Sequence, residues 1–258
     1  DGSELQKSVT TNLANTLQGR LSALTVIQNN AEPGLHTPDI FGRGIGTYGP
    51  GRELLIMVDG FESNFEHLTP YEVESITLLK DAAATAIYGS RGANGVLLVR
   101  TKRGRQGPLV VNFSTRTGFQ NARRLPQFLE AYDYARLYNE ALENEGQDPV
   151  YTSDELNAYR SGSNPYLYPN VNYYNELLRT TAPTSNYNLD FRGGNETVRY
   201  YGLLNVLDNN SLLIKSGDLS PENSVNANYT RYNFRTNIDV NLTRTLAASL
   251  TLGGSVEN

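Results

Sequence analysis

The second half of the chain alternates apolar and polar residues with a period of two. In 187–192 the odd positions hold Tyr, Leu and Phe, and the even positions hold Asn, Asp and Arg. In 232–240 the even positions are apolar or Thr, and the odd positions are Asn, Arg or Asp. The pattern recurs in 109–119 and more weakly in 246–252, whereas 198–207 has apolar residues on both faces. A period of two is that of a β-strand, so these segments predict five strands.

The connections between these segments alternate in length. About 65 residues (120–184) follow the first strand, and only 193–196 follow the second. A long loop at 208–230 and a short one at 242–244 come next. This alternation indicates an up-and-down sheet whose two ends face different compartments, as in outer-membrane barrels. A soluble β-sandwich also alternates inward and outward residues, so the pattern alone leaves both architectures open.

The first hundred residues predict a small α+β unit. Asp59-Gly60 is a turn pair, and Thr69-Pro-Tyr-Glu72 has the spacing of a capping box with proline at the first helical position. Asp81 is placed to cap an alanine-rich helix that Gly89 ends. The predicted elements are a helix at 12–19, strands at 24–28 and 53–58, a helix starting at 69–72, a strand at 74–79, a helix at 82–88 and a strand at 96–100.

A short basic stretch, Thr-Lys-Arg-Gly-Arg-Gln-Gly-Pro at 101–108, separates the two halves. Of the 17 tyrosines, 14 follow residue 101, so the composition also changes there. Gly and Pro within a charged stretch are typical of a linker between domains. An ordinary solvated loop would have the same composition, and the sequence leaves both interpretations open.

Composition excludes several classes of function. The 258 residues include no Cys and two His, which excludes disulfides, thiolate sites and a multi-histidine metal centre. The net charge of −5 and a pI of about 5.2 argue against nucleic acid as a partner. The longest apolar run is 54–58 and the mean hydropathy is −0.46, which is typical of a soluble protein. A transmembrane β-barrel gives the same average, because its apolar residues are interleaved with polar ones.

The segment Gly44-Ile-Gly-Thr-Tyr-Gly49 matches the dinucleotide fingerprint G-x-G-x-x-G. A nucleotide site needs a strand before these glycines and a helix after them. Here Pro50-Gly51 and a predicted strand come next, so we interpret the glycines as a tight turn in which backbone packs closely.

The first half carries four carboxylates that could pair for acid–base chemistry: Asp59, Glu72, Glu74 and Asp81. The turn, the capping box and the helix cap account for three of them. His36 falls in a loop and His67 just before a predicted helix, so surface or structural roles are expected for both. The sequence shows no assembled enzyme site, and we expect no metal and no cofactor.

Two further clusters have alternative interpretations. Arg100, Lys102, Arg103 and Arg105 could bind phosphate or anionic lipid head groups, or form a solvated strand end. The second cluster is aromatic and consists of Tyr166, Tyr168, Tyr173 and Tyr174. These tyrosines could stack on sugar rings or peptide side chains, pack within their own loop, or join an interfacial aromatic belt.

The motifs of the first half resemble a known domain. Leu-Ile-Met-Val-Asp-Gly at 55–60, followed by EVESITLLKDAAATAIYGSRGANGVLLVRTKRG at 72–104, closely resembles the plug domain of SusC/RagA-type TonB-dependent outer-membrane transporters. Leu-Gln-Gly-Arg at 17–20 and Gly-Arg-Gly-Ile-Gly at 42–46 are similar to earlier plug elements. Further on, Arg-Gly-Gly-Asn at 192–195, Tyr-Tyr at 200–201 and Arg-Tyr-Asn-Phe-Arg at 231–235 resemble the first barrel strands of that family.

This resemblance implies an α+β plug domain at 1–107, followed at 108–258 by the N-terminal strands of an antiparallel transmembrane β-barrel of about 22 strands when complete. We therefore expect an interior fragment, since neither a signal peptide nor the family's N-terminal extension is visible. The gate residues implied by the plug motif are Asp59, Gly60, Lys80, Asp81, Tyr88, Gly89, Arg91, Gly92, Asn94 and Gly95. Polar groups among them, such as Lys80 and Arg91, are expected to bond across a wet interface between plug and barrel.

The resemblance also implies a function, which is import of an oligosaccharide or peptide nutrient across the outer membrane of a Gram-negative bacterium, with glycans the favoured cargo. The implied partners are the inner-membrane TonB complex, reached through an N-terminal segment absent here, a SusD-like surface lipoprotein and outer-membrane lipid. No enzyme activity and no nucleic acid are expected. The alternative is a soluble periplasmic or surface binding module made of an α+β domain and a β-sandwich.

Overall fold

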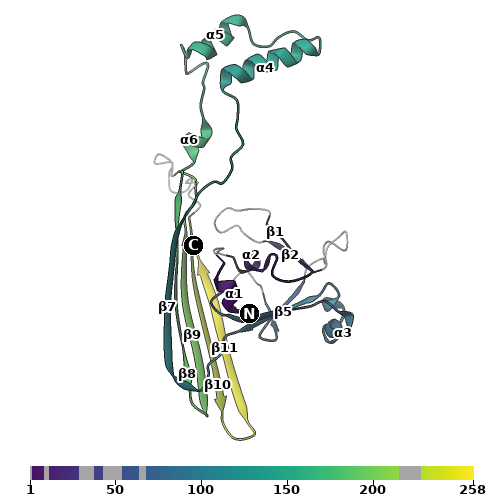
Figure 1. Ribbon diagram of the computed structural model, residues 1–258, viewed down its shortest axis with the longest axis vertical. Coiled ribbons are helices and arrows are strands. Elements are labelled where there is room, and N and C mark those ends of the chain that lie inside the picture. The colour runs from purple at the N-terminus through teal and green to yellow at the C-terminus, as the bar shows by residue number, and fades with distance from the viewer. Residues whose placement is uncertain (1, 9–11, 29–37, 43–53, 64–67, 215–227) are drawn as a thin grey trace. The chain divides into compact units, whose positions relative to one another are not determined.

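The computed structural model describes residues 2–8, 12–28, 38–42, 54–63, 68–214 and 228–258 (Figure 1). The chain divides into two compact units. The first comprises Asp1–Gly118, Pro183–Ser211 and Ala227–Asn258, and the second, here called the loop unit, comprises Phe119–Ala182 and Leu212–Asn226. The predicted glycine motif at 44–49, His36 and His67 lie outside the described residues.

The N-terminal part of the first unit is a mixed α+β structure around a small apolar core. β3 (Leu55–Val58) runs parallel to β6 (Val96–Thr101), and β6 is antiparallel to β5 (Val73–Leu79). The core includes Leu97 and Val99, which are buried among residues of the first two helices. The remaining elements are α1 (Gly2–Gln6), α2 (Leu13–Leu17), β1 (Leu24–Ile27), β2 (Asp39–Gly42), β4 (Phe61–Glu62), α3 (Ala82–Thr85) and the 3-10 helix η1 (Ala86–Gly92).

Two local predictions in this part are wrong. No helix starts at 69–72: Glu72 N–H donates to the Thr69 carbonyl at 3.3 Å in a single turn, and β5 begins at Val73. Half of the capping box is present, because Thr69 N–H donates to Glu72 Oε1 at 2.5 Å. Asp81 occupies an N-cap position, but its side chain makes no capping hydrogen bond, and the α-helix ends at Thr85 rather than reaching residue 88. A cap motif fixes one turn only, and the packing of the chain beyond that turn decides whether a helix or a strand continues it.

The second half forms one five-stranded sheet, here called the wall sheet (Figure 1). Its strands are β7 (Gly107–Gln120), β8 (Ala182–Gly194), β9 (Val198–Asn209), β10 (Tyr229–Asn241) and β11 (Ala247–Glu257). The spatial order β11-β10-β9-β8-β7 follows the chain, and each pair from β8 to β11 is antiparallel. All five predicted strands are confirmed, and the structure extends most of them by several residues.

The two faces of the wall sheet are the reverse of those in a water-soluble protein. In β10, Phe234 is 48% exposed, whereas Asn237 is 0% exposed. The register places Phe234 opposite Leu204, which in turn lies opposite Leu189, so apolar residues of three strands share the exposed face. A soluble antiparallel sheet buries its apolar face and leaves the polar face in water. The alternation predicted from sequence is confirmed, and the polar face is the one that is covered.

The loop unit is built from helices rather than strands. Its helices are α4 (Ala131–Asn144), α5 (Ser153–Ser161) and α6 (Tyr173–Leu177). A full capping box starts α5, with Thr152 as the cap and Glu155 three residues later. The hydrogen bonds from Thr152 hold the pKa of the Glu155 carboxyl below its ordinary value. Across the residues with a described fold, no helix combines the length and apolar character needed to cross a membrane.

Candidate functional site: the polar interface of the wall sheet

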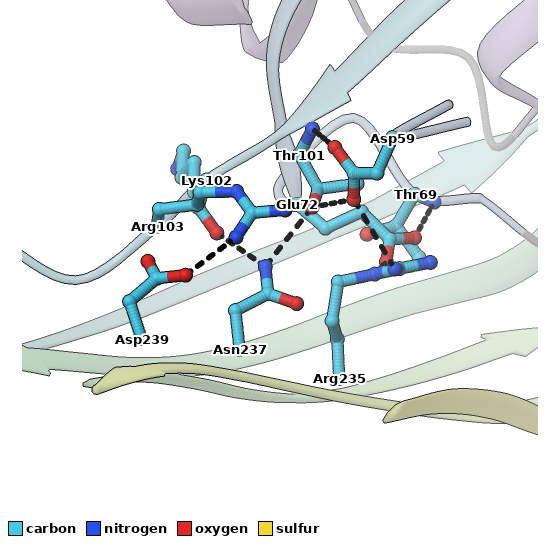
Figure 2. Close-up of polar contacts among 9 residues, drawn as sticks. All are labelled: Asp59, Thr69, Glu72, Thr101, Lys102, Arg103, Arg235, Asn237 and Asp239. Atoms are coloured by element: carbon cyan, nitrogen blue, oxygen red, sulfur yellow. Dashed lines mark hydrogen bonds and ion pairs between the residues drawn. The ribbon is translucent and has the colours of Figure 1, made fainter. Parts of the chain in front are cut away.

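Arg235 of β10 lies at the centre of a buried polar cluster between the wall sheet and the N-terminal part (Figure 2). Its Nε donates to the Glu72 carboxylate, and its Nη1 lies 4.0 Å from Asp59 Oδ2. All three side chains are almost entirely buried. One guanidinium therefore faces two carboxylates in a region that water barely reaches.

The two carboxylates are held in place from within the N-terminal part. Asp59 follows β3 in a left-handed turn with φ of 50°. Its Oδ1 accepts from Thr101 N–H at 2.9 Å, and its Oδ2 accepts from Thr101 Oγ1 at 2.5 Å. Glu72 is fixed in turn by the N–H of Thr69. Because these bonds do not involve the wall sheet, the acceptors are organised independently of Arg235.

The next two inward positions of β10 continue the contact. Asn237 Nδ2 donates to Thr101 Oγ1 at 3.0 Å and to the Lys102 carbonyl at 2.6 Å. Arg103 Nη1 donates to Asp239 Oδ1 at 2.8 Å. We call this set the polar latch and define it as Asp59, Glu72, Thr101, Lys102, Arg103, Arg235, Asn237 and Asp239. Residues 235, 237 and 239 point to the same side of β10, as the period of two requires (Figure 2).

The latch also explains the basic stretch between the two halves. Gly104 passes so close to β9 that an added Cβ would collide with the backbone of Tyr200. Arg105 pairs with Glu74 at 2.9 Å, and burial lowers the pKa of Lys102. The stretch therefore packs against the wall sheet, and Arg103 and Arg105 in it form ion pairs with Asp239 and Glu74. Neither a loose linker nor a freely solvated loop describes it.

A second contact joins the wall sheet to the N-terminal helix. Arg116 of β7 donates from Nη1 to the Ser8 carbonyl at 2.5 Å and from Nη2 to the Gln6 carbonyl at 2.7 Å. These carbonyls lie at and just beyond the C-terminus of α1, where helix carbonyls lack intrahelical partners. The same guanidinium lines a small cavity of about 70 Å³ together with Tyr71.

The structure divides the predicted gate residues into two places. Asp59 is a member of the latch, and Gly60 follows it in the turn with φ of 92°. The others lie between Lys80 and Gly95, around α3 and η1. Within this group Arg91 forms an ion pair with Glu62 of the N-terminal part itself. Gly89 and Gly95 have φ of 61° and 105°, which an L-residue rarely adopts.

Sequence reasoning misses the centre of the site. The capping-box motif explains only one of the two Glu72 oxygens, and the other accepts from Arg235. In the sequence, Asn237 is distinguished only as a member of a polar strand face, and Arg235 also ends the family-like motif at 231–235, which assigns it no partner. The available signal is an Arg and two amide or acidic residues at alternate positions of one strand, on the face expected to point inward.

The predicted tyrosine cluster is separated by the structure. Tyr173 and Tyr174 line a cavity inside the loop unit. Tyr168 instead packs edge-on against Tyr159, with ring centroids 5.2 Å apart, and Tyr166 is 96% exposed. Among the residues that the structure places, no group of three or more His, Asp or Glu side chains could hold a metal ion.

Comparison with known proteins decides the family. Residues 1–96 match the family model for the TonB-dependent receptor plug domain. The chain belongs to the TonB-dependent receptors. It is of the SusC/RagA type, whose members are outer-membrane proteins of Gram-negative bacteria. We refer to the N-terminal part as the plug from here on.

Individual relatives support this assignment. TonB-dependent receptor P3 of Formosa agariphila is 30% identical over 252 residues, which is 97% of this chain and 22% of that protein. TonB-dependent receptor SusC of Bacteroides thetaiotaomicron is 28% identical over 221 residues, covering 81% of this chain and 20% of SusC. The chain thus spans about a fifth of the length of the curated relatives it matches. These relatives are named as receptors and not as enzymes.

Solved structures confirm the fold. The RagAB peptide transporter superposes with a TM-score of 0.79 at 21% identity, over 99% of this chain and 30% of that chain. The siderophore receptor PirA of Acinetobacter baumannii has a TM-score of 0.57 at 15% identity, over 98% of this chain and 30% of that chain. At these identities the likeness concerns the fold alone. The likeness in fold explains the reversed faces of the wall sheet, because the strands of an outer-membrane barrel present apolar side chains to lipid.

Proposed function

We propose that the whole protein imports a nutrient across the outer membrane in a TonB-dependent manner, with the plug as the gate. In this proposal 1–107 is the plug domain, and 108–258 supplies the first strands of a barrel that has about 22 strands when complete. The cargo is an oligosaccharide or a peptide. The TonB complex would act through a segment N-terminal to the plug, and a SusD-like lipoprotein would cover the outer side.

The polar latch carries this proposal. A plug that only sealed the barrel could be held by apolar packing like that of its own core. Plug and wall do share one small apolar cluster of Tyr71, Tyr201 and Leu203, but the latch joins them through an Arg, two carboxylates and an amide. Polar groups can exchange their partners for water when the plug moves, whereas exposed apolar surface would be costly. A buried polar interface therefore suits a gate that opens and closes repeatedly.

We extend the proposed gate to the latch residues Glu72, Arg235 and Asn237, beside the plug-motif residues named above. Displacing the plug would break the bonds to Arg235 and would hydrate its two carboxylate partners. The carboxylates would stay on the plug, held by Thr69 and Thr101, ready to meet Arg235 again. The expected result is a reversible closure rather than an irreversible unfolding.

The cargo proposal has two sources. RagAB, to which the chain is similar in fold, is a peptide importer, and this gives the peptide option. The family resemblance favours glycans. The loop 120–184, which contains most of the loop unit, would face the outside, where cargo and lipoprotein arrive.

Uptake by the full-length protein in cells tests the gate. Arg91→Glu, or deletion of 86–95, should abolish or deregulate uptake while the barrel still assembles, as judged by heat-modifiable gel migration. The same is expected of Arg235→Glu, which places a further carboxylate beside Asp59 and Glu72. Arg244→Glu, in the exposed short connection after β10, is the matched control and should import normally. Unchanged TonB-dependent uptake in all gate variants would contradict the proposal.

The comparisons favour the transporter over a soluble binding module with a β-sandwich. A sandwich needs a second sheet over the apolar face of the first. The strands described after residue 106 all belong to one sheet, and its apolar face is exposed. Partition of the full-length product between buffer and detergent is the direct test. Recovery of a monomer from buffer without detergent would favour the module.

A further inference from the structure

The loop unit contains a cavity of about 1020 Å³ that the gate does not use. Its lining comes from 125–131, from the start of α4, from Tyr151 and Tyr159, and from 169–175. These are all parts of one compact unit. The volume is that of a site for a small or drug-sized ligand.

The aromatic rings of the loop unit fall into two groups. Tyr138, Tyr151, Tyr159 and Tyr168 contact one another edge-on in a continuous series, with centroid separations from 5.2 to 6.2 Å, and Tyr151 and Tyr159 of this series form part of the cavity wall. The second group, Phe128, Tyr173 and Tyr174, also lines the cavity. Phe128 is 78% exposed and Tyr173 is 68% exposed. Phe128 stacks on Tyr174 at 5.6 Å with an interplanar angle of 26°, which fixes the orientation of this pair. The cavity therefore has firm, accessible aromatic faces.

Amide groups at the cavity are held by their oxygens. Asn170 Oδ1 accepts from Ala131 N–H at 3.0 Å. Asn172 Oδ1 accepts from the N–H groups of Tyr174 at 3.1 Å and Asn175 at 3.4 Å, as the cap of α6. These bonds assign the oxygen side of each amide, so each NH₂ group lies on the other side. Among the residues that the structure describes, neither NH₂ group has a partner. Two positioned donors are therefore available at the cavity.

The charge of the lining is close to zero. Its described side chains include one carboxylate, Glu130, and no Lys or Arg. A ligand with carboxylate, sulfate or phosphate groups would find no cation here and would be repelled by Glu130. A hydroxyl-rich neutral ligand would find aromatic faces for its C–H surfaces, and amide and phenol groups for its hydroxyls.

We propose that this cavity is a binding site for a neutral oligosaccharide. Sugar rings would stack on Phe128 and Tyr173, and their hydroxyls would accept hydrogen bonds from the amides of Asn170 and Asn172. The proposal rests on the import function proposed above and adds the class of cargo. It places a first recognition site in the loop between β7 and β8 and excludes uronic acids, sulfated glycans and peptides with free carboxyl termini.

Calorimetry on the detergent-purified full-length receptor tests the site. The probes are a panel of neutral hexasaccharides built from glucose, mannose, galactose, xylose or fructose, with hexagalacturonate, a sulfated hexasaccharide and a hexapeptide as comparisons. At least one neutral probe should bind, and the charged probes should bind at least tenfold more weakly. Absence of binding by every neutral probe, or equal binding by a charged one, would overturn the proposal.

Variants identify where the sugar binds. Tyr173→Ala should weaken binding about fivefold, since one exposed stacking face is lost. Asn170→Asp keeps the acceptor for Ala131 N–H but removes the donor, and it should also weaken binding. Tyr166→Ala is the matched control, because Tyr166 is exposed and does not line the cavity; binding should be unchanged. Equal loss in Tyr166→Ala and Tyr173→Ala would place the ligand elsewhere and overturn the proposal.

A parallel uptake assay separates the two proposals. If cells show TonB-dependent uptake but the purified receptor binds no neutral probe, the cavity proposal alone is refuted. Uptake that does not depend on TonB refutes the import proposal, whatever the cavity binds.

Discussion

Replacing Arg235 with Met is the sharpest perturbation of the latch. Met has a similar length and no charge, so the change leaves Glu72 and Asp59 buried without their shared cation. Removing one partner of a buried ion pair costs about 3–5 kcal/mol. Glu72 keeps its bond from Thr69 and Asp59 keeps two from Thr101, which puts the expected cost near the lower end. About 3 kcal/mol corresponds to roughly a hundredfold shift toward the released plug.

A double-mutant cycle separates this cost from general damage. Glu72→Gln removes one of the two buried negative charges and can still accept from Thr69 N–H. We expect Arg235→Met combined with Glu72→Gln to recover at least about 1 kcal/mol relative to Arg235→Met alone, because fewer charges remain buried. Arg244→Met, at an exposed position, is the control for loss of an Arg from the wall.

Hydrogen exchange followed by mass spectrometry on the full-length receptor measures the effect. Exchange of peptides covering 68–80 and 96–104 reports local opening of the plug against the wall. Arg235→Met should accelerate exchange in these peptides about a hundredfold, whereas peptides of β9 should change little. An increase of less than about threefold, or a double variant that exchanges as fast as Arg235→Met, would refute the role given to the buried charges.

Three further results are expected. Gly104→Ala should destabilise the packing of 101–108 against β9 by about 1–3 kcal/mol, because the added Cβ would collide with the backbone of β9. The effect should be seen as faster hydrogen exchange at 102–105. Gly118→Ala is the control and should have no effect, because its Cβ would meet nothing closer than 3.9 Å. Gly89→Ala should lower the free energy of unfolding of the plug by about 1 kcal/mol, because an L-residue is strained at φ of 61°. An unchanged free energy of unfolding would show that the turn relaxes. The pKa of Glu155 is lowered in the folded state, so its stabilisation of α5 is present above the ordinary value of 4.5 and is lost as pH falls through the lower folded value. Protection of 153–161, corrected for the slower intrinsic amide exchange at low pH, should therefore fall on acidification, and this fall should be absent in Glu155→Gln.

The sequence by itself determined the strands and their two faces. A period of two is a local property, so each strand could be recognised from about ten consecutive residues. The sequence also determined the family, because the ordered plug motif between residues 55 and 104 is continuous in the chain. The plug motif and the strands of the wall sheet could thus be predicted without knowledge of long-range contacts.

Only the tertiary structure decided which face of the sheet is covered and which residues form the latch. A barrel wall and a sandwich share the same alternation, and they differ in what lies against each face. Arg235 and Glu72 are 163 residues apart, and the pairing arises only when β10 lies against the turn before β5. The same turn shows why the prediction of a helix at 69–72 is wrong. The local motif is typical of a helix start, but β5 begins at Val73 and pairs with β6 in the plug sheet, so the segment is a single turn followed by a strand. Local chemistry fixes where a side chain can point, and contacts distant in sequence fix what it meets.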